Sequence, residues 1–479
     1  MSVSHLSDFS DRVSPMLVKE LRQGMRAKAF VALFLSLQIF LAVMLLSATA
    51  ASTSDQVGST ISGIIFTFFA IAVLVVQPLR GTGALSSEVK GNTIDMMVLT
   101  RLSAWRIVFG KWVAIVSQSA LLLSTIIPYL ILRYFFGGMN LVGEVVLLLL
   151  MFLTSMALTA VTVGLSGCSS VIIRSLLPIF GIPILMFTLL QGMFFVRMGG
   201  SVGVMDAFSL ATTESRVGVA AYVFAITYLG ASLLSIGASL IAPAAENHAL
   251  LRRIIALVLL MVVGAAGFHP DVEDWFVMMM ALVIGAPAVI TALTDSAPYV
   301  STITTSFARF GPVGRALGWF LHPTWPSGLL AGILLGAASL AVIFVHGFLR
   351  NNSYGGVGDE ETVVVLSIFG GLIFPAVWQV FFFKGEGQRL AHYLLLAVGS
   401  FVLSMVLMGL ADSMNNGWFL WFFAWHPLAF LAMLEESTVS DSVILASVLM
   451  VDLAMVAILL IRAMMDIRKC DVHAIDADS

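Results

Sequence analysis

Long apolar runs separated by short polar intervals dominate the pattern of this chain. Each run approaches or exceeds the roughly 20 apolar residues that a helix needs to cross the hydrocarbon core of a bilayer. The runs lie at about 30–47, 59–77, 108–135, 143–165, 171–195, 219–241, 251–268, 275–293, 328–348, 363–383, 391–410 and 443–461. The pattern therefore predicts an all-α polytopic membrane protein with about 12 transmembrane helices.

The composition agrees with this class. With 479 residues, 59% of them hydrophobic and 11% charged, the chain is too apolar for a soluble globular protein. The two cysteines, Cys168 and Cys470, lie far apart in the sequence, so no disulfide framework is implied. The expected surroundings are a lipid bilayer, and no nucleic-acid partner is expected.

The distribution of Lys and Arg predicts the orientation of the helices. With about 12 spans and a cytosolic N-terminus, nearly all Lys and Arg fall on the cytosolic side, the exceptions being Arg133, Arg197, Arg216 and Arg350. Such an excess is typical of cytoplasmic loops, so both termini are expected to be cytosolic. If residues 418–434 also spanned the membrane, the basic C-terminal end would lie outside. Their many aromatic residues and the His426-Pro427 pair favour a re-entrant or interfacial segment instead.

Residues 1–29 are polar and basic, and they precede the first apolar run. Lys19, Arg22 and Arg26 recur on one face of a predicted helix whose other face is apolar. This pattern is typical of an interfacial helix that rests on anionic headgroups. A cleaved signal peptide ending near Ala50 is the rival interpretation. The long basic lead, and an apolar run longer than the usual ~7–15 residues, argue against it.

The most densely charged interval between two apolar runs is residues 79–110. Asn92 is a candidate helix N-cap, with Asp95 at the third helical position as in a capping box. Ser103 is a second candidate cap, after which the next membrane helix would follow directly. The interval is therefore predicted to form two short helices with a break. By its residues alone, it also fits a solvated amphipathic linker at the lipid surface.

The run Glu88-Val-Lys-Gly-Asn-Thr-Ile-Asp-Met-Met-Val-Leu-Thr-Arg-Leu-Ser, continuing to Gly110-Lys111, resembles the cytosolic segment of ABC-transporter permeases of the type-2 exporter family. The positions in register with that family are Thr93, Ile94, Asp95, Thr100, Leu102, Ser103, Gly110 and Lys111. Two positions depart from it, since Asn92 stands where Gly is usual and Arg101 where Pro is usual.

The resemblance implies that residues 79–110 are a coupling segment that docks on a separate ABC ATPase subunit. The residues implied in that contact are Glu88, Lys90, Asn92, Thr93, Asp95, Arg101 and Ser103. It also implies an exporter in a bacterial cytoplasmic membrane, with ATP and Mg bound by the partner subunit and no cofactor in this chain. Because Gly110-Lys111 is followed by Trp112 and no other Gly-Lys pair exists, the chain has no phosphate-binding loop and is not expected to be an enzyme.

Two regions of similar layout are predicted. Residues 30–242 would form a six-helix permease domain, and residues 243–462 a second six-helix region followed by a cytosolic tail, 463–479. In each, two spans precede a cytosolic stretch, which in the second region is 294–327 and lacks a copy of the coupling motif. If the second region duplicates the first, one chain supplies both halves of a permease. Otherwise a homodimer or a second permease subunit is needed.

Two further residues suggest other functions. Asp452 lies in the last apolar run, where a lipid-exposed charge costs at least ~2.5 kcal/mol. It would either bond to a neighbouring helix or serve as the ion site of a secondary transporter. Ser166, in Gly164-Leu-Ser-Gly167, matches a motif of intramembrane serine proteases, although no His partner is evident and helix packing is the commoner reason for such small residues. No metal site is expected.

Overall fold

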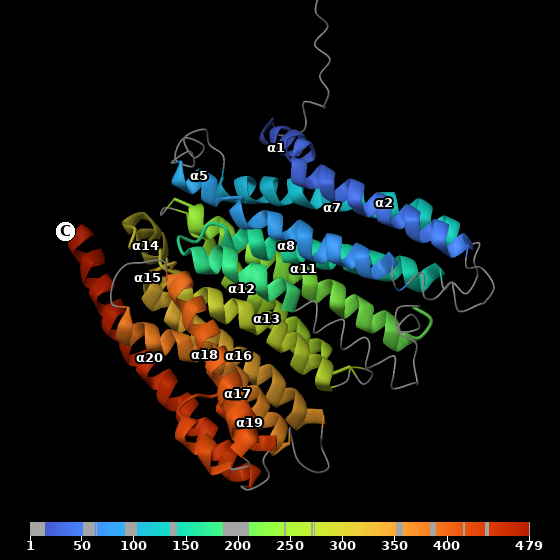
Figure 1. The fold of residues 1–479 in the computed structure, drawn as a ribbon. Helices are drawn as coiled ribbons and strands as arrows, with labels where there is room; N and C mark the ends of the chain where they lie inside the picture. The colour runs from blue at the N-terminus through green and yellow to red at the C-terminus, as the bar shows by residue number, and fades with distance from the viewer. Residues whose placement is uncertain are drawn as a thin grey trace, which may run out of the picture. The chain divides into compact units, whose positions relative to one another are not determined.

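The computed structural model of the chain describes residues 15–50, 63, 65–91, 103–134, 141–184, 210–243, 246–269, 272, 274–350, 358–383, 389–414, 417–435 and 440–478. Every regular element among them is a helix. The chain divides into two compact units, Met1–Ala242 and Pro243–Ser479 (Figure 1).

Eleven of the described helices are long and apolar enough to cross a bilayer. They lie at Lys28–Ser47, Ile65–Gly83, Ala104–Leu132, Leu141–Leu165, Ser215–Ile241, His248–Ala266, Phe276–Thr294, Trp325–Phe348, Asp359–Phe382, Arg389–Leu407 and Asp441–Ile467. Each coincides with a run predicted from the sequence. The remaining predicted run, 171–195, is described only as far as residue 184, where the shorter apolar helix Ile172–Ile184 lies. The polytopic helical class is therefore confirmed, while the count of about 12 spans and the orientation of the termini stay predictions.

Unit 1 contains the interfacial-helix candidate and the described part of the predicted coupling segment. Its elements are α1 (Pro15–Arg26), α2 (Lys28–Ala50), η1 (Ile71–Val76), α4 (Gln77–Leu79), η2 (Arg80–Gly83), α5 (Ser86–Lys90), α7 (Ala104–Tyr134), α8 (Leu141–Leu165), η3 (Ile172–Leu176) and α11 (Thr213–Ile241). The second span is irregular, because the π-helix η1 and the 3-10 helix η2 flank the short α4. Such departures from α-helical hydrogen bonding occur often at functional sites.

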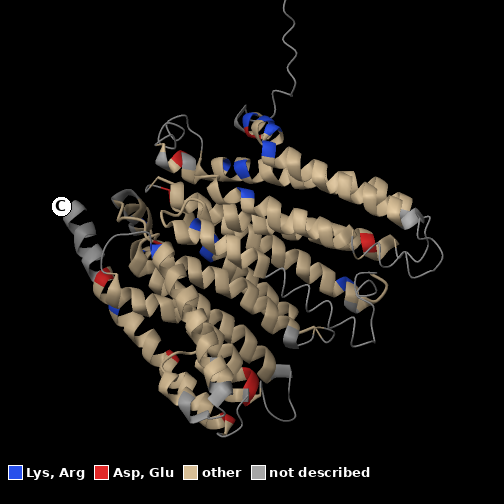
Figure 2. Ribbon diagram, viewed as in Figure 1, with Lys and Arg blue, Asp and Glu red and all other residues tan. Residues whose placement is uncertain are grey.

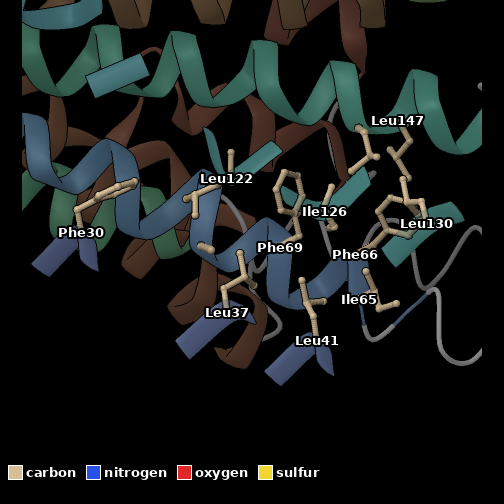
Figure 3. Packing of buried hydrophobic residues seen from close by; sticks show 13 residues of the cluster. Phe30, Leu37, Leu41, Ile65, Phe66, Phe69, Leu122, Ile126, Leu130 and Leu147 are labelled. Atoms are coloured by element: carbon tan, nitrogen blue, oxygen red, sulfur yellow. The ribbon is translucent and has the colours of Figure 1, made fainter. Parts of the chain in front are cut away.

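The core of unit 1 forms where the first three spans meet α8. Phe30, Leu37 and Leu41 project from α2 toward the aromatic side chains of the second span and the leucines of α7 (Figure 3). Phe69 and Leu122 are fully buried there. Other apolar residues of the same helices are exposed. Such exposure is expected of helices in contact with lipid.

Helices α8 and α11 approach each other closely through glycine. A Cβ at Gly237 would lie 2.8 Å from the Cα of Gly164, and one at Gly164 would collide with the carbonyl oxygen of Leu233. Small residues that bring helix backbones together are characteristic of membrane-protein interfaces. The Gly164-Leu-Ser-Gly motif therefore has a packing role.

Unit 2 also consists of long helices with shorter elements between them. These are α12 (His248–Ala266), α13 (Asp274–Thr294), α14 (Ser301–Ala308), α15 (Gly311–Leu321), α16 (Trp325–Arg350), α17 (Asp359–Phe382), α18 (Arg389–Met414), η4 (Gly417–Phe423), α19 (Ala429–Glu435) and α20 (Asp441–Asp478). The Asn247 side chain caps α12 by accepting a hydrogen bond from the Leu250 N–H at 3.1 Å. Helices η4 and α19, which occupy the predicted re-entrant or interfacial segment 418–434, are both too short to cross a bilayer.

The close approach of α8 and α11 predicts a position-dependent effect of alanine. Gly237→Ala should lower stability by about 1–3 kcal/mol, because the added methyl group forces the two helices apart. Gly218→Ala, on the same helix but with open space around its Cβ position, should be neutral or slightly stabilising. Thermal melting of the purified variants in detergent measures both effects. Equal shifts for the two variants would contradict the packing role.

Candidate functional site

The described part of the predicted coupling segment is tied to two other elements by Lys111. Glu88 lies in the first turn of α5, and Lys111 lies near the start of α7. The Nζ of Lys111 is 2.9 Å from Oε1 of Glu88 and 3.3 Å from Oε1 of Glu20 on α1. The Lys111 side chain is only 7% exposed, so one buried ammonium group links α1, α5 and α7.

A second anchor holds the residue just before α5. The Leu85 side chain is fully buried in a cluster with Ile107 of α7 and Val163 of α8. The backbone N–H of Leu85 donates to Oγ of Ser166 at 3.1 Å, and that hydroxyl in turn donates to the Val163 carbonyl at 2.6 Å. The start of the segment is thus fixed by apolar packing, a hydrogen bond and an ion pair.

These contacts define what Ser166 does in the structure. Its hydroxyl has backbone partners on both sides, and the side chain is fully buried. A serine nucleophile instead needs a general base within hydrogen-bond reach of its hydroxyl. The hydroxyl satisfies the backbone where the second span gives way to α5, which is a structural role.

Helix α1 has two chemically different sides. Glu20 and Gly24, one turn apart, face α7, since a Cβ at Gly24 would collide with Nε2 of Gln118. Lys19, Arg22 and Arg26 are exposed and share an open groove. The structure thus brings together the three basic residues of the predicted interfacial helix. Figure 2 shows Lys and Arg of unit 1 gathered mainly at the end where α1, α5 and the start of α7 lie.

A polar seam runs inward from this end, formed by Gln77, Arg80, Gln118, Ser119 and Ser155. The Arg80 guanidinium donates to Oε1 of Gln77 at 3.1 Å and to Oε1 of Gln118, and it lies 5.5 Å from the centre of the Phe30 ring. Ser155 on α8 donates to the carbonyl of Val73, inside the π-helix, at 2.7 Å. Because π-helical geometry disturbs the regular backbone ladder, this hydroxyl supplies a partner within the apolar interior.

Unit 2 has its own buried cation, Arg253, near the start of its first long helix. Arg253 on α12 is 3% exposed and donates to Oδ2 of Asp295, just after α13, at 2.6 Å. The same guanidinium donates to the His322 carbonyl at 3.0 Å and to Oγ of Ser327 at 3.2 Å. Arg252 donates to Oδ1 of Asp295 at 2.7 Å. These bonds therefore fasten both ends of the interval 294–327, which contains α14 and α15, to α12.

Asp452 lies in α20 and is 9% exposed. Its carboxylate is directed at Gly370 of α17 and at the neighbouring Pro427. Its Oδ1 atom has no hydrogen-bond partner among the described residues. Interhelical hydrogen bonding, one of the two roles expected for it, is therefore not seen in this part of the chain.

The structure describes only part of the residues predicted to contact the ATPase. Asn92, Thr93, Asp95 and Arg101 lie outside the described residues, and Lys90 is described only as the last residue of α5. Ser103 directly precedes α7, which continues without interruption into the third span as expected.

Sequence reasoning missed the partners Glu20, Gln77 and Gln118. The available signal was an unusual polar residue inside or beside an apolar run, but the sequence does not show which of these residues meet.

Fold and site together define a polytopic helical membrane protein with charged anchors at one end of each unit. Comparisons with models of known protein families, with curated proteins and with solved structures found no match.

Removal of the Lys111 charge should loosen the attachment of α1 and α5. Lys111→Met leaves two largely buried carboxylates without a counter-charge, so stability should fall by about 3 kcal/mol. The triple variant Lys111→Met/Glu20→Gln/Glu88→Gln should regain part of this loss, because it removes the unpaired charges. Denaturation in mixed detergent micelles measures the stabilities. A Lys111→Met variant as stable as the unsubstituted protein would show that the Lys111–Glu20–Glu88 cluster is not a structural anchor.

His322 predicts a pH-dependent stability of unit 2. Burial, and secondarily the charge of Arg253, lowers the pKa of His322 to about 4 from its usual value near 6.5. Folding therefore favours the neutral imidazole, and the contribution of His322 to the free energy of unfolding is fully present above about pH 6.5. It is lost as the pH falls toward 4, by up to about 3 kcal/mol.

Denaturation of the His322→Gln variant at about pH 7 and about pH 4.5 tests this contribution. The variant should lose part of the acid sensitivity of the unsubstituted protein, whereas His269→Gln, at an exposed position, should retain it. Identical pH profiles for all three proteins would contradict the assignment to His322.

Proposed function

We propose that the chain is the membrane-spanning permease subunit of an ATP-driven ABC transporter, and that this transporter is an exporter. A separate ATPase subunit would dock on the segment after the second span and supply the energy. The observation that supports this proposal best is the attachment of Glu88, the first residue of the resembling motif, through Lys111 to α7 and α1. A docking segment has to be fastened to the spans it moves, and a flexible surface linker does not.

The anchors suggest how force would reach the membrane. ATP and Mg would bind the partner subunit, and its closure would push on residues 88–102. Lys111 would transmit the push to α7, and Leu85, at the end of the second span, would transmit it through Ser166 to α8. The polar seam begins at that end, and hydrogen-bonded side chains offer alternative pairings when helices shift. The spans would then alternate between inward-open and outward-open arrangements.

The two units bear on the organisation of the proposed assembly. Each has a buried cation that fastens the stretch after its second long span, Lys111 in unit 1 and Arg253 in unit 2. The two cations lie on different spans of their units, the third in unit 1 and the first in unit 2, so a chain that supplies both halves, a homodimer and a second permease subunit all fit these anchors. The proposed location is a bacterial cytoplasmic membrane, with Lys19, Arg22 and Arg26 at its anionic inner surface.

The second candidate function is secondary transport. It rests on Asp452, a buried carboxylate within a long apolar helix whose Oδ1 atom lacks a hydrogen-bond partner in the described part of unit 2. Transport that is abolished by an uncoupler and indifferent to loss of any ATPase would favour this candidate. The described contacts of Ser166 are to backbone groups, and none of them favours an intramembrane serine protease.

Co-purification tests the primary proposal. The tagged full-length chain, extracted from its own host in mild detergent, should bring down an ABC ATPase identified by mass spectrometry. Asp95→Lys reverses a charge within the docking segment and should lower ATPase recovery by about tenfold or more, equivalent to about 1.4 kcal/mol. Glu360→Lys, the same reversal at an exposed position at the start of α17, should leave recovery unchanged.

Two outcomes of the co-purification would contradict the proposal in whole or in part. If the unsubstituted chain brings down no ATPase under conditions that preserve its fold, the proposed function is wrong. If ATPase is recovered equally with both reversal variants, a different surface receives the partner.

A further inference from the structure

Two titratable side chains lie buried in the interior of unit 2, each with an unused polar atom. Asp452 on α20 is 9% exposed, and its Oδ1 has no partner among the described residues. His426, in the break between η4 and α19, is 2% exposed. Its Nδ1 is 3.2 Å from Oγ of Ser404, and its Nε2 has no partner in the described part of the chain. Buried polar groups normally have partners, so two such atoms in one region need an explanation.

Both side chains lie against the same face of α17. The carboxylate of Asp452 fills the space that a side chain at Gly370 would occupy, beside Pro427. The His426 ring meets the edge of Phe374, with ring centres 4.5 Å apart. Positions 370 and 374 are one helical turn apart and share a face. Gly370, by lacking a side chain, makes room for the carboxylate.

The surroundings contain no described charge that would balance an ionised Asp452. Arg462 is ten residues further along α20, about 15 Å away along the helix axis, and Asp441 is eleven residues back. The hydroxyl of Tyr393 donates to the Leu372 carbonyl at 2.6 Å. The titratable or charged residues on α17, α20 and the helices packed against them are, besides Asp452, Asp274, His346, Arg350, Asp359, Glu360, Glu361, Arg389, His392, Tyr393, Asp412, Glu435, Asp441, Arg462, Asp466, Arg468, Lys469, Cys470, Asp471, His473, Asp476 and Asp478.

We propose that Asp452 and His426 form an intramembrane proton-binding site, with the Asp452 carboxyl as the principal proton carrier and His426 as its second titratable group. A protonated carboxyl packs against Gly370 and Pro427 without a buried charge. When the proton leaves, the resulting carboxylate demands water or a positive partner, and an imidazole that takes up a proton supplies one. The packing of the broken segment η4–α19 on α17 thereby depends on proton occupancy. This site does not rely on the ATP-driven function proposed above.

Carbodiimide labelling tests the site in the intact chain. Dicyclohexylcarbodiimide partitions into apolar surroundings and reacts with protonated carboxyl groups, and mass spectrometry of peptides identifies the labelled residue. In the full-length protein in lipid nanodiscs, Asp452 should be labelled at about pH 6, and labelling should fall at least about tenfold by about pH 9. Asp452→Asn should abolish the signal.

Variants separate the proposed pair from a lone buried acid. His426→Gln should move the midpoint of the labelling profile to higher pH by at least about half a unit, because the carboxylate loses its proton-accepting neighbour. Ser404→Ala removes only the hydroxyl beside Nδ1 and should move the midpoint in the same direction by less. Glu144→Gln, at a buried carboxyl of unit 1, should leave the Asp452 profile unchanged.

Several results would overturn the assignment. They are the absence of Asp452 labelling in folded protein at acidic pH, labelling that does not vary with pH, and a profile unmoved by both His426→Gln and Ser404→Ala. Protection by Na⁺ or K⁺ at constant pH and ionic strength would assign the site to a metal cation instead. Because the assay needs neither ATPase nor transport, its outcome is separate from that of the co-purification.

Discussion

A single buried ammonium group, that of Lys111, determines how the charged end of unit 1 is built. Two carboxylates from different elements approach it, and neither is held in place by a long helix of its own, since α1 has 12 residues and α5 has five. Short helices have little stability in isolation, so their positions depend on tertiary contacts. Loss of one partner of an ion pair that is shielded from water leaves an uncompensated charge, which destabilises more than the loss of an exposed partner. The proposed transmission of force rests on this attachment.

Apolar packing and polar contacts have different tasks in the two units. The close approach of glycine on α8 and α11 and the cluster around Phe69 hold the long helices together. In a bilayer this association depends on close packing, because lipid is as apolar as the side chains it replaces. Polar side chains appear where the helical pattern is interrupted, as Ser155 does beside the π-helix and Asn247 does at the start of α12. The charged clusters of Lys111 and Arg253 lie at the ends, where the connecting stretches begin.

The helical class was predictable because it depends on a coarse property, namely apolar runs long enough to span a bilayer. The basic face of α1 was predictable for a similar reason, since three cations at helical spacing must share a side. The partners of Lys111 were not predictable, because Glu20, Glu88 and Lys111 are joined only by the packing of α1 on α7. The neighbours of Asp452 were equally hidden, since nothing in the sequence near Gly370 indicates that its missing side chain leaves room for a carboxylate from α20. Contacts between polar residues that are distant in the sequence become evident only from the fold.

The most direct test of the central claim measures which side of the membrane carries the segment after the second span, and whether a partner covers it. A single cysteine at position 93, introduced by Thr93→Cys in a variant that also has Cys168→Ser and Cys470→Ser, is reacted with a membrane-impermeant maleimide. Labelling is expected in inverted membrane vesicles stripped of the ATPase but not in intact cells, and protection is expected when the co-purifying ATPase is added back. Labelling from the outside of intact cells, or no labelling from either side without denaturation, would contradict the claim.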